Sequence, residues 1–478
     1  MTGLLLDPPD RFDLETEVAI VGSGGCGLTA ALAAREAGAE VWLFERDRVP
    51  RGSTAMSSGM IPAAGTRFQR ARGIDDDPDR FAADILAKNG GAADRTIVTA
   101  LAQRAAPTVE WLVDRFGLRL DLVEGFLYPG HSRPRMHAPP GRSGAELVGA
   151  LVCAAEEAGT SLLCEARVDA LFVERAPEGK VRRVRGLRLE RHDGRVESVA
   201  AAAVVLACCG YGGAPDLVRR FVPEMAEAPY YGHAGNQGDA LRWSEALGAG
   251  LADLGAYQGH AGLAVPHEVL ITWAIVMEGG VQLDATGRRF ADETRGYSEQ
   301  AALVRARPGG VAWILFDEAR HRLALAFEDY RRALEAGAIR SAPDPETLAE
   351  VTGLPAEALA ETLAEVRALA RTGGTDRFGR CFGGTSPLEP PYRAVKVTGA
   401  LFHTQGGLVV DPKARVLRPD GSPIAGLFAG GGAARGVSGP GAAGYLSGNG
   451  LLSAIVLGRI AGESAAEGAR GVASGCGV

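Results

Sequence analysis

A glycine-rich hexapeptide near the N-terminus, Gly22–Gly27 (GSGGCG), has the G-x-G-x-x-G spacing of turns that bind a dinucleotide. The apolar run Val18–Val21 precedes it, and an Ala- and Leu-rich helical segment follows and ends near Gly38. A second apolar run, Val41–Phe44, leads to Glu45. In dinucleotide-binding units an acidic residue at this position accepts a hydrogen bond from a ribose hydroxyl of the ligand. The glycines let a pyrophosphate approach the helix N-terminus, whose free N–H groups favour anions. The pattern predicts a β-turn-α-β unit that binds a dinucleotide; the alternative is a glycine-rich turn in another α/β protein.

Three further segments carry side chains that can bind or react. Arg51–Met60 is rich in small residues and hydroxyls, and it is either a strap along a flat ring or pyrophosphate or an ordinary surface loop. His403 stands in a turn flanked by glycines, which favours a site over the core. The Pro- and Gly-rich segment Gly125–Arg142 either presents cations to an acidic ligand or is a solvated basic loop. Its polar members are Tyr128, His131, Arg133, Arg135, His137 and Arg142.

Composition limits the class of protein. With 478 residues the chain is too long for one core, so we expect two domains or one domain with a large insertion. The net charge of −7 argues against a nucleic-acid partner. We see no apolar run of membrane-spanning length and no signal peptide. The seven cysteines show no C-x-x-C pair, so we expect reduced thiols, no metal site and a cytoplasmic protein.

The elements that must position these residues alternate between strands and helices. Apolar residues at helical spacing predict helices within Pro78–Phe116 and Ser143–Ala158. The run Ala200–Ala207 predicts a strand that ends in a glycine turn, and Asn449–Gly462 predicts a long helix. Residues 257–390 differ in character, and we interpret them as an inserted domain that serves as a lid.

Together these residues resemble the flavoprotein family of fumarate reductase and succinate dehydrogenase subunits and 3-ketosteroid dehydrogenases, over nearly the whole chain. The resemblance implies an α/β fold: a Rossmann-like FAD-binding domain, residues 1–256 and 391–478, with an inserted α+β capping domain, residues 257–390, that closes over the flavin. The matching segments are Gly22–Gly27, Glu45, Gly52–Gly59, Val204–Gly212, Gly235–Asp239, Gly287–Glu293, His403–Gly407, Gly426–Gly432 and Gly448–Gly462.

The resemblance also assigns the residues that hold FAD. The flavin should be non-covalent, because Ser53 stands where membrane-bound succinate dehydrogenases carry the covalent histidine. Gly432 replaces a glutamate that often contacts the flavin. The expected FAD-binding residues are Gly22, Gly24, Gly25, Gly27, Glu45, Arg46, Ser53, Thr54, Ser57, Ser58, Gly59, Val168, Gly210, Asp239, Gly430, Gly431, Ser447, Gly450 and Leu451.

Departures from the fumarate reductase pattern indicate the chemistry. Tyr297 stands where those enzymes carry the arginine that delivers a proton, as in the 3-ketosteroid dehydrogenases, where a tyrosine is the base. Arg295 lies two residues earlier, so a proton-delivering arginine shifted by two positions stays an alternative. Tyr445 replaces the arginine that binds the substrate carboxylate, whereas His403 and His260 match family histidines.

These residues can form a double bond in a ketone by removing hydrogen from the carbons α and β to its carbonyl. Tyr445 and backbone N–H groups near Gly448–Gly450 would polarise the carbonyl oxygen. Tyr297 would take the α-proton, and flavin N5 would take the β-hydride. A phenol has a pKa near 10, so we expect Arg295 or His260 to lower the pKa of Tyr297.

Cations near the expected cleft favour a substrate with a carboxylate. The preferred substrate is therefore a small cyclic oxo-acid, and the resemblance to ring-ketone desaturases of this family implies one such as 4-oxocyclohexanecarboxylate. A 3-ketosteroid comes second because the chain is compact for a steroid enzyme. Two alternatives stay open: a fumarate-reductase-like enoate reductase with Arg295 as proton donor, and a non-catalytic flavin-binding redox protein. The electron acceptor is not identified. The cations are His131, Arg133, Arg135, His260, His403 and Arg435; His260, Arg133, Arg435 and Gly448 are the expected substrate-binding residues.

Overall fold

The sheet that carries the glycine turn is built on strand β2, whose apolar residues are buried on both faces. β2 (Leu14–Val21) pairs in parallel with β3 (Val41–Phe44) on one side and with β10 (Val196–Leu206) on the other. The strand order is β1-β8-β9-β20-β10-β2-β3-β7, with β19 paired to β20. The five strands from β7 to β20 are parallel, as in dinucleotide-binding folds. The other strands are β1 (Leu4–Leu6), β7 (Ser161–Leu163), β8 (Ala166–Arg175), β9 (Val181–Arg191), β19 (Arg415–Leu417) and β20 (Pro423–Ala429).

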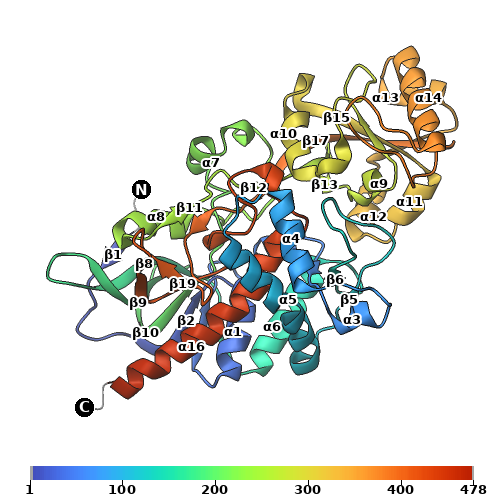
Figure 1. The fold of residues 1–478 in the computed structure, drawn as a ribbon. Coiled ribbons are helices and arrows are strands. Elements are labelled where there is room, and N and C mark those ends of the chain that lie inside the picture. The colour runs from blue at the N-terminus through green and yellow to red at the C-terminus, as the bar shows by residue number, and fades with distance from the viewer. Residues whose placement is uncertain (1–3, 476–478) are drawn as a thin grey trace.

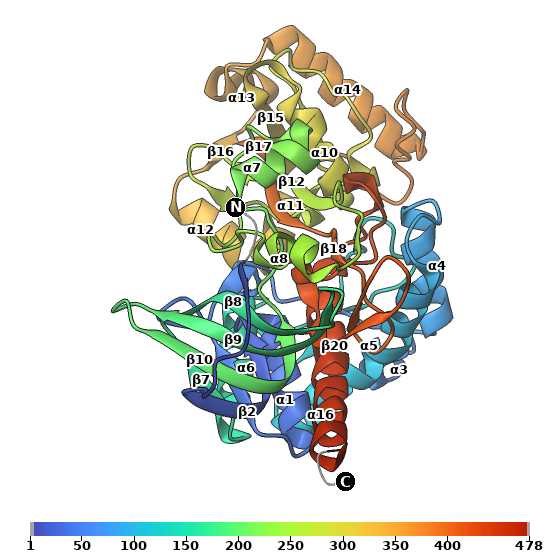
Figure 2. The same cartoon turned by 90° about the vertical axis from the view of Figure 1, so that its left-hand side faces the viewer.

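Two helices from opposite ends of the chain cover one face of this sheet. A computed structural model describes residues 4–475, and in it α1 (Gly25–Glu36) lies beside the long α16 (Leu457–Gly475) (Figures 1 and 2). Their axes approach closely because Gly462 has no side chain: a Cβ there would lie 2.1 Å from the carbonyl oxygen of Ala30. The C-terminal helix therefore completes a unit that the N-terminal residues begin.

A second sheet, entirely antiparallel, forms the other lobe in Figure 1. Its order is β13-β12-β17-β15-β14, with β16 paired to β17. Helices surround it, and α10 (Tyr297–Arg305) packs on β12 and β17 at the side that faces the first lobe. The strands are β12 (Tyr257–Ala264), β13 (Val269–Leu270), β14 (Val281–Leu283), β15 (Val311–Asp317), β16 (Ile339–Ala342) and β17 (Tyr392–Thr404); the helices are α9 (Ala274–Met277), α11 (Glu318–Ala324), α12 (Glu328–Glu335), α13 (Pro345–Thr352) and α14 (Ala356–Thr372).

The two sheets confirm the predicted α/β fold, with a Rossmann-like domain and an additional capping domain. Within the described residues, β17 pairs with β12, β15 and β16 of the second sheet, so this sheet extends beyond residue 390, and the domain boundaries stay a prediction. The helical region expected over Pro78–Phe116 consists of α4 (Pro78–Lys88) and α5 (Arg95–Phe116). The N-cap of each is an Asp, whose side chain accepts backbone N–H bonds.

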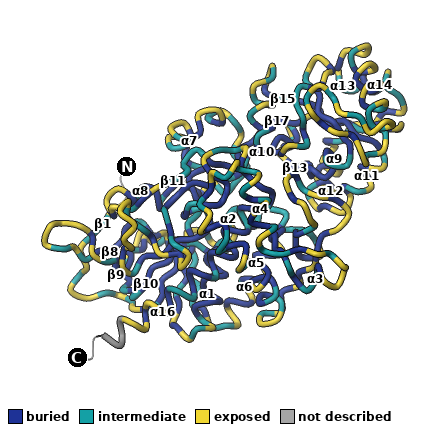
Figure 3. Tube along the Cα trace, viewed as in Figure 1, coloured by how far each residue is buried: buried dark blue, intermediate teal, exposed yellow. Residues whose placement is uncertain are grey.

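Short elements fill the junction between the lobes, where the backbone is mostly buried (Figure 3). The segment expected as a loop at 51–60 contains one helical turn, α2 (Gly52–Ala55). Within residues 4–475, no helix has the length and apolar character that crossing a membrane requires. The remaining elements are β4 (Ile61–Pro62), β5 (Asp121–Leu122), β6 (Met136–Ala138), β11 (Leu251–Ala252), β18 (Gly407–Leu408), α3 (Arg67–Arg70), α6 (Gly144–Glu157), α7 (Pro215–Phe221), α8 (Asp239–Leu247) and α15 (Asn449–Leu451).

Candidate active site

Two cavities meet at the junction of the lobes. The first, which we call the glycine cavity, is bounded by the Gly22–Gly27 turn, Glu45 and the ends of β8 and β10. The second, the tyrosine cavity, is bounded by Tyr297, Tyr445 and residues of β12 and β17. The cavities share a wall, so one extended ligand can reach from the glycine turn to the two tyrosines. The shared residues are Ser53, Thr54, Cys209, Gly432 and Ala454.

The glycine cavity has the features that a dinucleotide requires. A Cβ on Gly27 would lie 1.8 Å from the carbonyl oxygen of Gly22, so only glycine permits this contact between turn and helix. Gly24 lines the cavity and begins α1 with no side-chain cap, which leaves the helix N-terminus available to an anion. The Glu45 carboxylate is held by the backbone N–H of Ser23 at 2.9 Å and its hydroxyl at 2.5 Å. The donor N–H groups and the carboxylate of this cavity have the chemistry that binding of FAD requires.

Most of the expected FAD-binding residues line one of the two cavities, and their roles toward FAD remain predictions. Five glycines lie behind the walls instead, where each permits a close packing contact: Gly59, for example, would place a Cβ 2.7 Å from the Ser143 carbonyl oxygen. The residues on the walls are Gly22, Gly24, Glu45, Arg46, Ser53, Thr54, Ser57, Ser58, Val168, Asp239, Gly431, Ser447, Gly450 and Leu451, and the five behind them are Gly25, Gly27, Gly59, Gly210 and Gly430.

His233 lines the glycine cavity but carries no sequence signal, whereas Asn236 belongs to the matching segment Gly235–Asp239. Both bond to Ser53 Oγ, at 3.3 Å through the His233 backbone N–H and at 2.8 Å through the Asn236 amide. The His233 ring also lies 2.6 Å from an Asp47 carboxylate oxygen. Only the neighbouring motif Gly235–Asp239 was noticeable in the sequence. The loop that closes over this cavity is thus specified mainly by tertiary contacts.

The tyrosine cavity brings together residues from three distant parts of the chain. Tyr297 begins α10, and its ring stacks on His260 of β12 with centroids 4.6 Å apart. Its ring centroid lies 6.1 Å from that of Tyr445. The Tyr297 phenol lies near the Ser447 hydroxyl and the Tyr445 phenol, and all three residues line the cavity. The structure therefore brings three hydroxyl groups together at one cavity.

A histidine and a helix N-terminus complete this cluster. The His403 ring meets Tyr445 edge-on, with centroids 5.6 Å apart, and its Nδ1 lies 3.1 Å from the side-chain amide of Gln405. The N–H of Gly450, near the start of α15, points at the Tyr445 phenolic oxygen at 3.4 Å. A Cβ on Gly450 would lie 2.8 Å from His403, so this close approach requires glycine.

Every titratable group in the tyrosine cavity is neutral near pH 7. Burial lowers the pKa of His260 to about 3 and that of His403 to about 4. Burial also raises the pKa values of Tyr297 and Tyr445 well above 10. We expected a nearby cation to lower the pKa of Tyr297, and this expectation is wrong. Burial raises that pKa, and the neighbouring His260 is uncharged and cannot offset the increase.

Arg295 does not reach the cavity. Its side chain is 73% exposed, and its guanidinium lies 3.8 Å from the Asp292 carboxylate. Among the described residues that line the tyrosine cavity, none is Arg, Lys, Asp or Glu. This placement does not fit the proton-donor role expected for Arg295 in an enoate reductase.

The arginines expected to bind a substrate carboxylate are engaged elsewhere. Arg133 is exposed and bonds to the Ser132 carbonyl oxygen at 2.8 Å. Arg435 pairs with Asp253 at 2.7 Å and with Asp94 at 3.2 Å. Of the four expected substrate-binding residues, only His260 and Gly448 line the tyrosine cavity. The cationic substrate site that the sequence suggested is thus not formed.

Comparisons with known proteins agree with this geometry. A family model described as "FAD binding domain" matches residues 17–451. The chain is 32% identical over 457 residues to the probable fumarate reductase Ifc3 of Shewanella frigidimarina (strain NCIMB 400), with 95% of this chain and 75% of that protein covered.

Two solved structures share the fold. The open conformation of a flavocytochrome c3 fumarate reductase superposes with a TM-score of 0.78 at 30% identity, covering 96% of this chain and 79% of that one. The 3-ketosteroid-Δ4-(5α)-dehydrogenase of Rhodococcus jostii RHA1, solved with 4-androstene-3,17-dione, superposes with a TM-score of 0.76 at 25% identity, covering 98% of this chain and all (100%) of that one. The predicted cofactor is confirmed: the chain belongs to the FAD binding domain family and is an FAD-dependent oxidoreductase.

Proposed function

We propose that the protein desaturates an uncharged ring ketone, removing hydrogen from the carbons α and β to the carbonyl. The observation that carries the proposal is the pair of neutral phenols, Tyr297 and Tyr445, in a cavity where, within the described part of the chain, no charged side chain lies on the wall. Apolar side chains such as Leu270, Trp273 and Phe402 form much of the rest of the cavity wall. Such walls suit a hydrophobic ring with one polar end.

Tyr445 would polarise the carbonyl. Because its oxygen accepts from the Gly450 N–H, its own proton is free to be donated to a ketone oxygen. Donation to that oxygen stabilises negative charge that develops there when the α-carbon loses a proton. Bound FAD would accept the β-hydrogen as a hydride, which is the redox chemistry that the protein itself cannot supply.

Tyr297 would receive the α-proton at its phenolic oxygen. The phenol is neutral, so it acts as a base only once its own proton has left. The Ser447 hydroxyl on the same wall would take that proton while its own proton passes to solvent water, and the Tyr297 phenolate then takes the α-proton. We therefore assign the base function to Tyr297 with Ser447 as its proton relay, and we call the two the Tyr297–Ser447 pair.

The uncharged cavity changes the preferred substrate. A cyclic oxo-acid such as 4-oxocyclohexanecarboxylate would bring a carboxylate into the cavity with no described cation to pair with it, which is unfavourable. A neutral 3-ketosteroid-like ring system meets no such penalty, and we place it first.

A fumarate-reductase-like reaction is the second candidate, because the chain is 32% identical to a probable fumarate reductase. Reduction of a dicarboxylate needs groups that bind its charges and a proton donor. In this chain Tyr445 and Tyr297 occupy the cavity, and Arg295 is on the surface. The geometry favours the desaturase.

Anaerobic mixing of the FAD-loaded protein with neutral steroid ketones, cyclic oxo-acids and succinate tests the proposal through the loss of flavin absorbance. Bleaching by neutral ring ketones supports it. If oxo-acids alone bleach the flavin, the chemistry holds and the substrate preference is wrong. Reoxidation of the reduced flavin by fumarate, with no bleaching by any ketone, would establish the reductase instead.

A further inference from the structure

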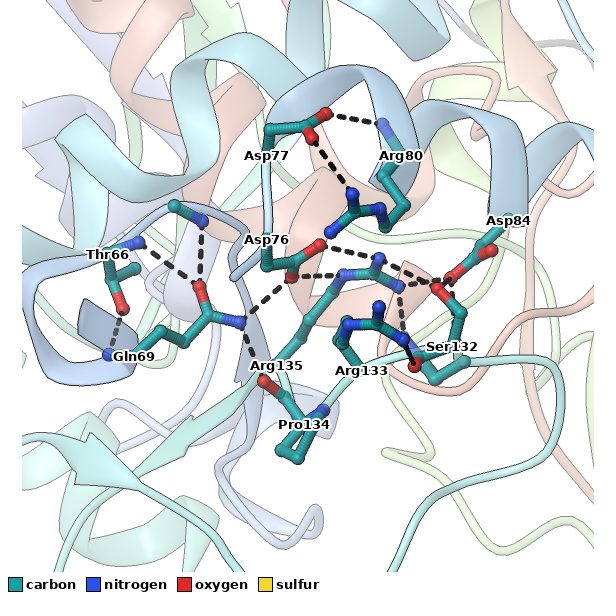
Figure 4. Close-up of polar contacts among 12 residues, drawn as sticks. Thr66, Gln69, Asp76, Asp77, Arg80, Asp84, Ser132, Arg133, Pro134 and Arg135 are labelled. Carbon is teal, nitrogen blue, oxygen red and sulfur yellow. Dashed lines mark hydrogen bonds and ion pairs between the residues drawn. The ribbon is translucent and has the colours of Figure 1, made fainter. Parts of the chain in front are cut away.

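The segment Gly125–Arg142, predicted as a cationic or solvated loop, is folded inward. Its Arg135 side chain is 0% exposed and lies between two carboxylates rather than toward a ligand (Figure 4). Arg135 bonds to both oxygens of Asp76, at 2.7 and 2.9 Å, and to Asp84 of α4. Ser132 also donates to Asp84, through its backbone N–H at 2.8 Å and its hydroxyl at 2.7 Å. A bidentate buried ion pair of this kind has one geometry, so it makes the segment rigid.

This rigid cluster holds His131 in one orientation. His131 Nδ1 lies 3.4 Å from the Arg135 guanidinium, and its ring lies nearly parallel to that of Phe81, at an interplanar angle of 26°. The guanidinium is always charged and can only donate hydrogen bonds, so it selects the tautomer with an unprotonated Nδ1. Burial lowers the pKa of His131 to about 4, so the ring is neutral near pH 7 and its one proton is on Nε2.

His131 Nε2 donates this proton to the backbone carbonyl of Ser447 at 2.8 Å. The donor and the acceptor residue are 316 positions apart in the chain. Ser447 itself is 3% exposed and lines the tyrosine cavity, where its side chain lies near that of Tyr297. Fixing the carbonyl of Ser447 fixes the backbone from which the hydroxyl projects.

We infer that His131 is a positioning residue for the Tyr297–Ser447 pair and that Arg135 sets its tautomer. The inference rests on the proposed function, since the pair matters only if it moves the α-proton. His131 lines neither the tyrosine cavity nor the glycine cavity. It acts by holding the Ser447 peptide in the position that the proton transfer needs.

Three variants separate this role from general damage to the segment. His131→Leu removes the hydrogen bond to Ser447. His131→Gln retains a side-chain N–H that can reach the same carbonyl. His137→Gln is the matched control, because His137 is a buried histidine of the same segment that bonds to Thr66 at 2.9 Å and to the Arg135 carbonyl oxygen at 2.8 Å, but not to Ser447.

The decisive measurement is exchange of the ketone α-hydrogens into D2O, catalysed by the enzyme with its flavin reduced so that hydride transfer is blocked. For His131→Leu we expect exchange to slow by about 10- to 100-fold, the scale of a small misplacement of a reacting group. His131→Gln should recover most of the rate, and His137→Gln should keep it. FAD content and thermal stability should be similar in all three.

Backbone hydrogen exchange of residues 445–450, followed by mass spectrometry, provides a readout that needs no substrate. It should become faster in His131→Leu alone. Wild-type exchange in both measurements for His131→Leu, or equal losses in His131→Leu and His137→Gln, would overturn the inference. If the wild type neither bleaches nor exchanges with any ring ketone, the proposed function fails and the catalytic role of His131 fails with it, whatever the backbone exchange shows.

Discussion

The glycine cavity and the tyrosine cavity share a wall but differ in how the chain builds them. One continuous stretch, residues 18–45, supplies the strand, turn, helix and acid that define the glycine cavity. The tyrosine cavity takes its residues from β12, α10, β17 and the segment before α15. A cofactor site can therefore be recognised locally, whereas the residues of the proposed reaction meet only after both lobes have folded.

The cavities also differ in charge. Glu45, Arg46, Arg167 and Asp239 line the glycine cavity, as suits a cofactor that carries phosphates and ribose hydroxyls. Among the wall residues that the structure describes in the tyrosine cavity, none is charged and the histidines are neutral. The glycine cavity thus suits a polar cofactor, and the adjoining tyrosine cavity suits an uncharged ligand.

The largest expected effect is on the glycine cavity. Gly27→Ala would place a methyl group 1.8 Å from the Gly22 carbonyl oxygen, so the turn must open and the phosphate site with it. We expect loss of nearly all bound FAD, measured as the ratio of flavin to protein absorbance. Gly149→Ala, in α6 with nothing within 4 Å, should keep its flavin. A Gly27→Ala protein with full FAD content would show that this turn does not hold the cofactor.

A change in the tyrosine cavity should spare the cofactor and stop the reaction. For Tyr297→Phe we expect flavin reduction by a ring ketone to slow by about 10²–10⁴-fold, the usual contribution of a general base, at unchanged FAD content. Rapid-mixing absorbance measures the rate. Tyr330→Phe is the control, because Tyr330 is also buried in the cap but bonds to His321 at 2.7 Å. Equal rates in Tyr297→Phe and the wild type would remove Tyr297 from the mechanism.

Tyr445→Phe should have a smaller effect, because the N–H of Gly450 stays in place and can itself approach the ketone oxygen. Loss of one such donor typically costs about 10²–10³-fold in rate, and we expect the lower end of that range. The same rapid-mixing assay applies. An unchanged rate with a raised KM would mean that Tyr445 binds the ketone without stabilising the developing charge.

The smallest expected effect is on the pH dependence of the free energy of unfolding. The unfolded chain protonates its histidines near pH 6.5. In the folded protein burial lowers the pKa of His403 to about 4 and that of His260 to about 3. Between these values the unfolded state binds more protons, so the free energy of unfolding should fall as the pH drops from about 6.5 to about 4. His260→Gln should make this decline shallower in thermal unfolding at constant ionic strength; an unchanged slope would mean that His260 is charged in the fold.

Much of the cofactor site was predictable because its determinants are local. The order of strand, glycine turn, helix and Glu45 follows from the turn geometry and from the spacing of apolar residues. Tyr297 and Tyr445 could be singled out through the family resemblance. The orientation of Gly125–Arg142 could not, because the carboxylates that draw Arg135 inward come from Asp76 and Asp84, about 50 residues away or more.

The sequence by itself determined a dinucleotide-binding turn and the identity of the residues that replace arginines in the cavity. Only the tertiary structure decided the charge state of the titratable residues that line the cavity. Whether a histidine is a cation or a neutral ring, and whether an arginine faces a ligand or a carboxylate, depends on burial and on partners from distant segments. Such neighbours are set by the packing of the two lobes, and no local pattern in the chain encodes them.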